Sequence, residues 1–311
     1  FAKQVDLWRE TCSLTDEALA KKIHEDRVDI LFELSGHTAY NRMGVLALKP
    51  APLQASYLGY PGTTGLPTID FRITDELVDP VGMTEKFHTE RLIRLSRCAW
   101  CYEPDAVAPE VATLPYQRNA HITFGCFNNM AKLNPALFDM WADILIKVPN
   151  SHLRLKARTL TDDRVKNELK DYFTAKGIAA ERLDFFGHTR KIHEHLNHYH
   201  EVDIALDSFP YHGTTTTCEA MWMGCPVVTR AGGAHVSRVG VSLLSAVGLE
   251  ELIGQNREDY IRKAVTLAGD IDRLVELRAG MRDRLKSSPL MNAPDFALEF
   301  EVALLKMAEA R

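Results

Sequence analysis

The sequence predicts an α/β protein built from two Rossmann-like, doubly wound domains. Strand-like apolar runs alternate with helix-like amphipathic runs along almost the whole chain. That alternation is typical of parallel sheets whose strands are joined by helices. The chain has 311 residues, which is more than one such core usually holds, so two domains are expected.

The first part of the chain carries three predicted strands, and a polar or glycine-containing loop follows each of the first two. Ligands of parallel sheets collect at the carboxyl ends of the strands, so His37, Gly62 and Thr63 are candidate residues of a cleft. The alternatives are a structural histidine and an ordinary glycine turn. In chain order we expect a helix at 15–27, strands at 29–34, 53–58 and 71–74, and loops at 35–38 and 59–65.

Residues 103–118 interrupt this alternation with three prolines and little periodicity, which predicts an interdomain linker. We therefore place the first domain and the linker at 1–118 and the second domain at 119–311. We expect the first domain to be truncated at its N-terminus, because the chain begins without Met in the middle of a pattern. The elements expected next are strands at 122–127, 152–156, 182–186, 202–207 and 226–229, and helices at 135–147, 162–176, 192–200 and 236–247.

Composition narrows the class of protein. The formal net charge is −5, so no basic footprint predicts nucleic-acid binding. No apolar run is long enough to span a membrane, and the first residues are unlike a signal peptide. The six cysteines suit free thiols in a reducing compartment, and we predict a cytoplasmic protein. Cys98 and Cys101 form a lone Cys-x-x-Cys pair, so zinc or redox use is the less favoured interpretation.

The most informative stretch is 211–224, which reads Tyr-His-Gly-Thr-Thr-Thr-Thr-Cys-Glu-Ala-Met-Trp-Met-Gly. It follows a predicted strand and leads into a predicted helix. Threonines at that position can cap the helix and direct hydroxyls and backbone N–H groups toward one point, which suits a diphosphate. Glu219 lies one turn further, where a carboxylate can hold a pair of sugar hydroxyls. A solvated threonine-rich turn is the alternative.

A second candidate site lies between the strand at 122–127 and the helix at 135–147. Asn128, Asn129 and Lys132 occupy this strand-end loop. A lysine there can neutralise the charge on a leaving diphosphate without a metal. The alternative is a solvated surface lysine beside an asparagine-rich turn.

A third candidate is a group of histidines at positions 188, 193, 195, 198 and 200. His195 and His198 are three residues apart and fit one helical face. A shelf for a nucleotide base is better motivated than a metal site, because no carboxylates stand at ligand spacing. A polar helix face is the remaining interpretation.

Together these stretches resemble the catalytic region of O-linked N-acetylglucosamine transferases, and the SPINDLY branch most closely. The resemblance covers nearly the whole chain and rests on residues 29–38, 72–75, 127–132, 202–224 and 287–290. Membership of this family, glycosyltransferase family 41, implies a GT-B arrangement of two Rossmann-like domains facing a cleft. It also implies inverting, metal-independent transfer of a sugar from a nucleotide donor to Ser or Thr hydroxyls of acceptor proteins.

The resemblance also assigns roles to residues. Lys132 matches the lysine that contacts the donor diphosphate and assists its departure, His195 a histidine that packs on the base, and Glu219 the acidic residue that holds the ribose. Arg190 and Ile192 fall in the segment that lines the base. The implied donor-binding set is Asn128, Asn129, Arg190, Ile192, His195, Gly213, Thr214, Thr215, Thr216, Thr217 and Glu219.

Two features of the family are missing from this sequence. The Asp-Phe-x-x-His motif, which supplies a proposed catalytic histidine, would lie upstream of Phe1, and so would the tetratricopeptide repeats. We therefore expect the 311 residues alone to be inactive or nearly so. The predicted donor is UDP-N-acetylglucosamine (UDP-GlcNAc), with no further cofactor. The alternatives are a protein O-fucosyltransferase using GDP-fucose, a nucleotide-sugar epimerase and a non-catalytic donor-binding scaffold.

Overall fold

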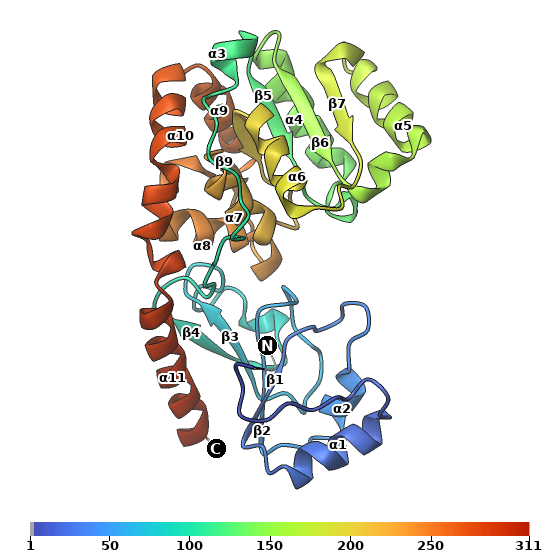
Figure 1. The fold of residues 1–311 in the computed structure, drawn as a ribbon, viewed down its shortest axis with the longest axis vertical. Coiled ribbons are helices and arrows are strands. Elements are labelled where there is room, and N and C mark those ends of the chain that lie inside the picture. Colours follow the sequence, from blue (N-terminus) through green and yellow to red (C-terminus); the bar gives the residue numbers. More distant parts are fainter. Residues whose placement is uncertain (1–2, 311) are drawn as a thin grey trace. The chain divides into compact units, whose positions relative to one another are not determined.

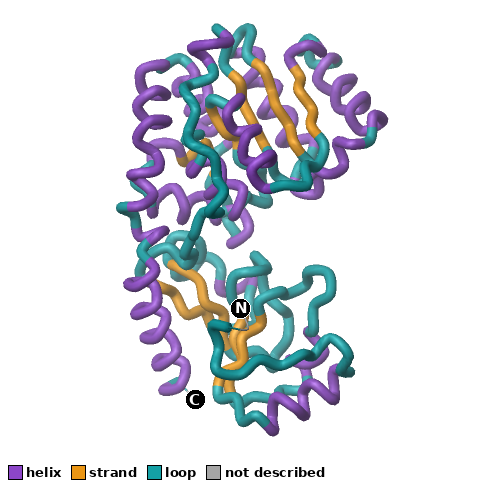
Figure 2. The backbone as a smooth tube through the Cα atoms, viewed as in Figure 1, coloured by secondary structure: helices purple, strands orange, loops and turns teal. Residues whose placement is uncertain are grey.

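The computed structural model describes residues 3–310, which belong to two compact α/β units (Figures 1 and 2). Unit 1 comprises Phe1–Ala99 and Leu298–Arg311, and unit 2 comprises Trp100–Ala297. Each unit contains one parallel sheet, as the alternation of strand and helix patterns predicts. No helix within residues 3–310 is both long and apolar enough to cross a membrane.

The sheet of unit 1 has four parallel strands in sequential order. An apolar cluster that includes Leu19, Val45 and Ile69 packs the helices against the chain that joins the strands. The predicted helix start at Thr15 is confirmed, because its hydroxyl accepts the Ala18 N–H at 3.2 Å. The elements are α1 (Asp16–Glu25), β1 (Ile30–Glu33), α2 (Met43–Ala47), β2 (Leu53–Ser56), β3 (Phe71–Asp75) and β4 (Arg91–Leu95).

The sheet of unit 2 has six strands in the order β10-β9-β8-β5-β6-β7. Numbered within the unit, this is the 3-2-1-4-5-6 order of doubly wound dinucleotide-binding folds, whose switch point lies between the first and fourth strands. Those two strands are β5 and β8, which pair in parallel. The strands are β5 (Thr123–Cys126), β6 (His152–Lys156), β7 (Leu183–Phe186), β8 (Ile204–Leu206), β9 (Val227–Arg230) and β10 (Ile253–Gly254).

Helices complete unit 2, and local sequence explains where they begin. Asn134 caps α4 by accepting the Leu137 N–H at 3.0 Å, and Pro135 occupies the first helical position, where its missing N–H costs nothing. The helices are α3 (Tyr116–Asn119), α4 (Pro135–Lys147), α5 (Asp163–Thr174), α6 (Ile192–Asn197), α7 (Thr215–Trp222), α8 (Val239–Ala246), α9 (Arg257–Ala268) and α10 (Ile271–Lys286), with α11 (Ala293–Glu309) ending in unit 1.

The proline-rich segment 103–118 is fastened to unit 2. Arg278 and Arg282 of α10 donate to its carbonyl oxygens, Arg278 to Ala112 O at 2.7 Å and Arg282 to Pro109 O. The buried Arg278 guanidinium also donates to Val202 O at 2.8 Å, so one charged group ties the segment to the start of β8.

The core of unit 2 extends beneath the switch point. Trp141 of α4 is fully buried and donates its indole N–H to the hydroxyl of Tyr260 in α9, at 3.1 Å. Tyr260 in turn donates to the backbone oxygen of Asp207 at 3.1 Å. The polar atoms of these two large side chains thus have hydrogen-bond partners. The two hydrogen bonds fix the position of the backbone that leaves β8.

Candidate functional site

The carboxyl ends of β5 and β8 bring together two segments about 80 residues apart in sequence. Asn128, just after β5, donates to the hydroxyl of Ser208 at 2.8 Å and to the carboxylate of Asp207 at 3.3 Å. All three side chains belong to buried residues. The two loops at the switch point therefore form one hydrogen-bonded structure, as expected for the ligand-binding edge of such a sheet.

The threonine run begins α7 at this edge. Thr214 occupies the position before α7, which starts at Thr215, so the threonines lie at the beginning of a helix and three of them form its first turn. The predicted hydroxyl cap is not formed at Thr214, because its side chain makes no capping hydrogen bond. Within residues 3–310, the backbone N–H groups of Thr214, Thr215 and Thr216 have no acceptor. Three free amides at a helix N-terminus suit an anion.

Gly213 is required by the close packing of this turn. A Cβ atom there would lie 2.5 Å from Thr216 Oγ1, 2.8 Å from Asn128 Oδ1 and 2.8 Å from Thr217 Oγ1. The Gly213 N–H donates to the Asp207 carboxylate at 2.8 Å, and the hydroxyl of Thr216 donates to Asn128 Oδ1. These contacts fix the turn that precedes α7.

Lys132 lies beside the same turn. Its ammonium donates to His212 O at 2.7 Å and stands 4.1 Å from the centre of the Tyr211 ring. Burial lowers the pKa of Lys132, and the nearby Asp207 carboxylate opposes that effect. A partly desolvated cation next to free helix amides can stabilise negative charge that develops on a diphosphate.

His195 and Glu219 form the second half of the candidate site. His195 Nε2 lies 3.1 Å from Glu219 Oε2, and His195 Nδ1 lies 2.8 Å from the ammonium of Lys156. Both side chains of the pair are partly exposed, at 19% for His195 and 14% for Glu219. The predicted histidine and acidic residue are thus brought together, with Lys156 as a third member.

Aromatic rings surround this pair. The His198 ring lies 4.9 Å from that of Phe186, and Phe127 is within 6.0 Å of His195 and 6.2 Å of His198. Burial, with a smaller contribution from the Lys156 charge, lowers the pKa of His198 to about 4. His198 is therefore a neutral ring at ordinary pH.

Three predicted donor residues have no side-chain hydrogen bond or ion pair to the groups above among the residues that the structure describes. Asn129 accepts the Ala131 N–H at 3.1 Å and caps a short 3-10 turn. Arg190 is exposed in the segment between β7 and α6, and Ile192 is the first residue of α6. They lie at the carboxyl-end side of the sheet, and their roles stay predictions.

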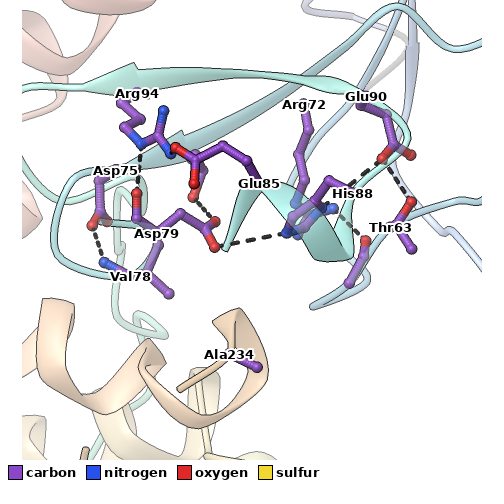
Figure 3. A network of polar contacts seen from close by, with 12 residues as sticks. Thr63, Arg72, Asp75, Val78, Asp79, Glu85, His88, Glu90, Arg94 and Ala234 are labelled. Carbon is purple, nitrogen blue, oxygen red and sulfur yellow. Dashed lines mark hydrogen bonds and ion pairs between the residues drawn. The ribbon is translucent and has the colours of Figure 1, made fainter. Parts of the chain in front are cut away.

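The candidate residues of unit 1 take part in polar contacts within that unit, and Figure 3 shows the contacts around Thr63 and Glu90. Thr63 donates to the Glu90 carboxylate at 2.7 Å, and the buried Arg72 donates to Gly62 O at 2.8 Å. His37 Nε2 lies 2.8 Å from Thr64 O. These contacts tie the two predicted loops to each other and to β3, which gives each candidate a structural explanation.

Figure 3 also shows His88 between two acidic residues. Its Nε2 lies 3.7 Å from Asp79 Oδ1, and its Nδ1 lies 3.9 Å from Glu90 Oε2. Within residues 3–310, no three histidine, cysteine or acidic side chains are grouped so that they can hold a metal ion. Cys98 is buried and Cys101 exposed, and neither forms a disulfide among the residues that the structure describes.

The geometry can now be compared with known proteins. The sequence profile of glycosyl transferase family 41 matches residues 2–102 and 111–300. The chain belongs to this family. The resemblance found in the motifs is thereby confirmed, and the matched residues include nearly every element described above.

Relatives place the chain near the SPINDLY branch of family 41. The Arabidopsis thaliana protein named "Probable UDP-N-acetylglucosamine--peptide N-acetylglucosaminyltransferase SPINDLY" is 42% identical over 305 residues, which cover 98% of this chain and 33% of that protein. The chain thus spans about one third of the length of the curated relatives it matches.

Solved structures confirm the predicted fold class, an α/β protein of GT-B type. A point mutant of the O-GlcNAc transferase of Thermobaculum terrenum is 36% identical, with a TM-score of 0.92 over 98% of this chain and 58% of that chain. The sucrose-phosphate synthase of Thermosynechococcus elongatus is 16% identical, with a TM-score of 0.59 over 95% of this chain and 78% of that chain. The second likeness concerns the fold alone.

Two residues of the site were missed from the sequence. Asp207 comes directly after β8, and Lys156 is the last residue of β6. Both are charged and buried at the carboxyl end of a strand, the position at which ligands of parallel sheets collect. A charged residue at the end of an apolar strand was the signal that could have identified them.

Proposed function

We propose that the protein containing this chain is an inverting protein O-glycosyltransferase that transfers GlcNAc from UDP-GlcNAc to Ser or Thr hydroxyls. The observation that carries the proposal is that the Lys132 ammonium and the three free amides at 214–216 belong to one turn at the start of α7, beside the His195–Glu219 pair. The first group suits a diphosphate and the second a nucleoside.

In the proposed reaction, the acceptor hydroxyl oxygen attacks the anomeric carbon of the sugar from the side opposite the diphosphate. The bond from that carbon to the diphosphate oxygen breaks, and the nucleoside diphosphate leaves with the electron pair. Lys132 and the free amides at Thr214 and Thr215 stabilise the charge on the leaving group. They take the role that a metal ion has in other transferases, so the reaction is proposed to need none. The hydroxyl gives its proton to a general base, for which the histidine of the family's Asp-Phe-x-x-His motif is proposed.

The other parts of the proposal come from the family. For the whole protein we propose acceptor proteins as partners, upstream tetratricopeptide repeats and a cytoplasmic location. The relatives of the whole protein are about three times longer than this chain. We propose that the second predicted domain, residues 119–311, binds the donor, and that residues 1–118 comprise the first domain and the linker. His37, Gly62 and Thr63 stay candidates for the acceptor side.

The variant Lys132→Met tests the proposal. It removes the cation but keeps a long apolar side chain, so kcat of the full-length protein should fall at least about 100-fold, as for loss of one charge-stabilising donor. The melting temperature should stay close to that of the wild type. Lys147→Met, at the exposed end of α4, is the matched control and should keep full activity. Unchanged turnover in Lys132→Met would contradict the role of Lys132.

Calorimetric titration with UDP and GDP tests the donor. Preferential binding of UDP supports UDP-GlcNAc. A clear preference for GDP would replace the proposed reaction with protein O-fucosylation. Product analysis separates the remaining alternatives, because an epimerase needs no acceptor protein and leaves the nucleotide on the sugar, whereas a scaffold consumes no donor.

A further inference from the structure

Lys156 is the buried member of a three-residue chain of hydrogen bonds. Its ammonium contacts His195 Nδ1 at 2.8 Å, and His195 Nε2 contacts Glu219 Oε2 at 3.1 Å. The three residues come from β6, α6 and α7. Lys156 is 5% exposed, whereas the side chains of its two neighbours are 19% and 14% exposed. Lys156 therefore stands behind the pair that a ligand can reach.

The hydrogen-bond chemistry of lysine determines the tautomer of His195. An ammonium group has donors only, so the Nδ1 atom that faces it must accept and carries no proton. The remaining ring proton is then on Nε2, directed at the Glu219 carboxylate. With Nδ1 accepting from the ammonium at 2.8 Å, the ring carries one proton and is neutral.

This tautomer leaves Glu219 available to a ligand. One carboxylate oxygen, Oε2, accepts the His195 N–H. Oε1 accepts no hydrogen bond from any residue in the described part of the chain. Because His195 is neutral, the carboxylate is not paired with a cation at short range and keeps its full strength as an acceptor. A pair of sugar hydroxyls needs such an acceptor.

We propose that Lys156 is a positioning residue for the nucleoside part of the donor: it fixes His195 in the Nε2–H tautomer and thereby keeps Glu219 free for the ribose. This inference rests on the proposed function, since it deepens the assignment of the same site. Lys156 acts on nucleoside binding indirectly, through His195. It does not belong to the group around Lys132 that is proposed to bind the diphosphate.

The other titratable groups around His195 are consistent with this role. His198, in the next turn, is neutral because burial lowers its pKa to about 4. Tyr199 is fully buried, and burial raises its pKa well above the ordinary value. Burial lowers the pKa of Lys156 itself, while Glu219 opposes that change. Lys156 is thus the one cation, and Glu219 the one anion, in direct hydrogen-bond contact with the His195 ring among the described residues.

Uridine is the probe that tests the proposal, because it lacks the phosphates that titrate near pH 6. In Lys156→Met, His195 is free to take a proton at Nδ1 and to pair with Glu219 as an imidazolium. Uridine affinity should fall about tenfold at pH 7.5, the loss expected for a charge-assisted hydrogen bond, and further at pH 5.5. The wild type should lose less affinity between these pH values. Pyrophosphate binding should change little in the variant.

Lys156→Arg restores a cationic donor and should keep uridine affinity within about threefold of the wild type. Lys147→Met is the control for loss of a surface lysine. Nitrogen-detected NMR should show His195 protonated on Nε2 in the wild type. The proposal is overturned if Lys156→Met binds uridine like the wild type at both pH values, if the Arg variant is as weak as the Met variant, or if wild-type His195 carries its proton on Nδ1.

The wild-type titration separates this inference from the proposed function. If the wild type binds neither UDP nor GDP, the proposed function fails. If it prefers GDP, guanosine takes the place of uridine in every arm of the test. If the wild type binds the nucleotide but the Lys156→Met and Lys156→Arg variants have the same nucleoside affinity, only the inference about Lys156 fails.

Discussion

At the scale of single residues, the site depends on how a partly buried lysine, Lys132, keeps its charge. Burial lowers the pKa of Lys132, and Asp207 opposes this effect, with a smaller contribution from Cys126. The other facing groups are the backbone oxygen of His212 and the ring of Tyr211. Activity that needs the ammonium form should therefore decline at a lower pH than the titration of an exposed lysine.

Asp207→Asn removes the opposing charge, so the alkaline limb of the kcat profile should move to lower pH than in the wild type. The measurement is kcat against pH in the full-length protein. Asp171→Asn, an exposed position on α5, is the control and should leave the limb in place. A uniform loss of kcat in Asp207→Asn with an unshifted limb would mean that Asp207 acts on structure alone.

His198 makes a separate prediction about stability. Its pKa in the folded chain is about 4, against an ordinary value of about 6.5. Between these values the unfolded chain binds a proton that the folded chain does not, so the free energy of unfolding falls as pH drops from 6.5 to 4. In His198→Phe, the loss of stability between pH 7 and pH 5 should be smaller by about 1 kcal/mol, after allowance for solvent screening of a half-buried ring. Urea unfolding at the two pH values measures this, and equal losses would contradict it.

At the scale of elements, the turn before α7 is the most sensitive part of the site. Gly213→Ala would place a methyl group within 2.8 Å of three side-chain oxygens, so the turn must shift and the free amides of α7 move with it. UDP affinity should fall at least about tenfold, as for loss of a charge-assisted hydrogen bond. Gly233→Ala is the matched control, because a Cβ there meets no atom within 4 Å. Calorimetric titration of both variants with UDP measures the effect. Similar UDP affinities in the two variants would show that the turn tolerates the added methyl group.

Most elements could be predicted from sequence because their periodicity and caps are local. The strand at 152–156 and the helix at 135–147 have the predicted bounds. Strand β4 (Arg91–Leu95) was missed, because it mixes arginines with apolar residues and only its pairing with β3 makes it a strand. The predicted helix at 192–200 ends as α-helix at Asn197 and continues as a 3-10 turn. Thr216 lies in the turn that the sequence indicates as a candidate site, but its bond to Asn128 depends on residues 88 positions apart, which no local pattern shows.

At the scale of the whole molecule, the order of residues in the chain differs from their grouping in space. The first unit ends at Ala99, and the chain returns to it at Leu298, within the last helix. Sequence placed the boundary after the prolines at 118, because a change of composition is visible locally and the return of the last helix is not. The proline-rich segment is held by arginines of α10, which are far away in sequence.

The last helix allows a test of how independent the two units are. Phe300 packs its ring 5.6 Å from Phe32 and 5.4 Å from Tyr57, both in unit 1. Phe300→Ala should destabilise unit 1 by about 2 kcal/mol, less than for a fully buried ring, while Leu298→Ala, at a 63% exposed position on the same helix, should change stability little. Hydrogen exchange measures each sheet separately, and UDP titration reports on the site in unit 2. We expect faster exchange in β1 and β2, with unchanged exchange in β5 and β8 and unchanged UDP affinity. Equal acceleration in both sheets would show instead that the two units unfold together, because their stabilities would then be coupled through the chain that joins them.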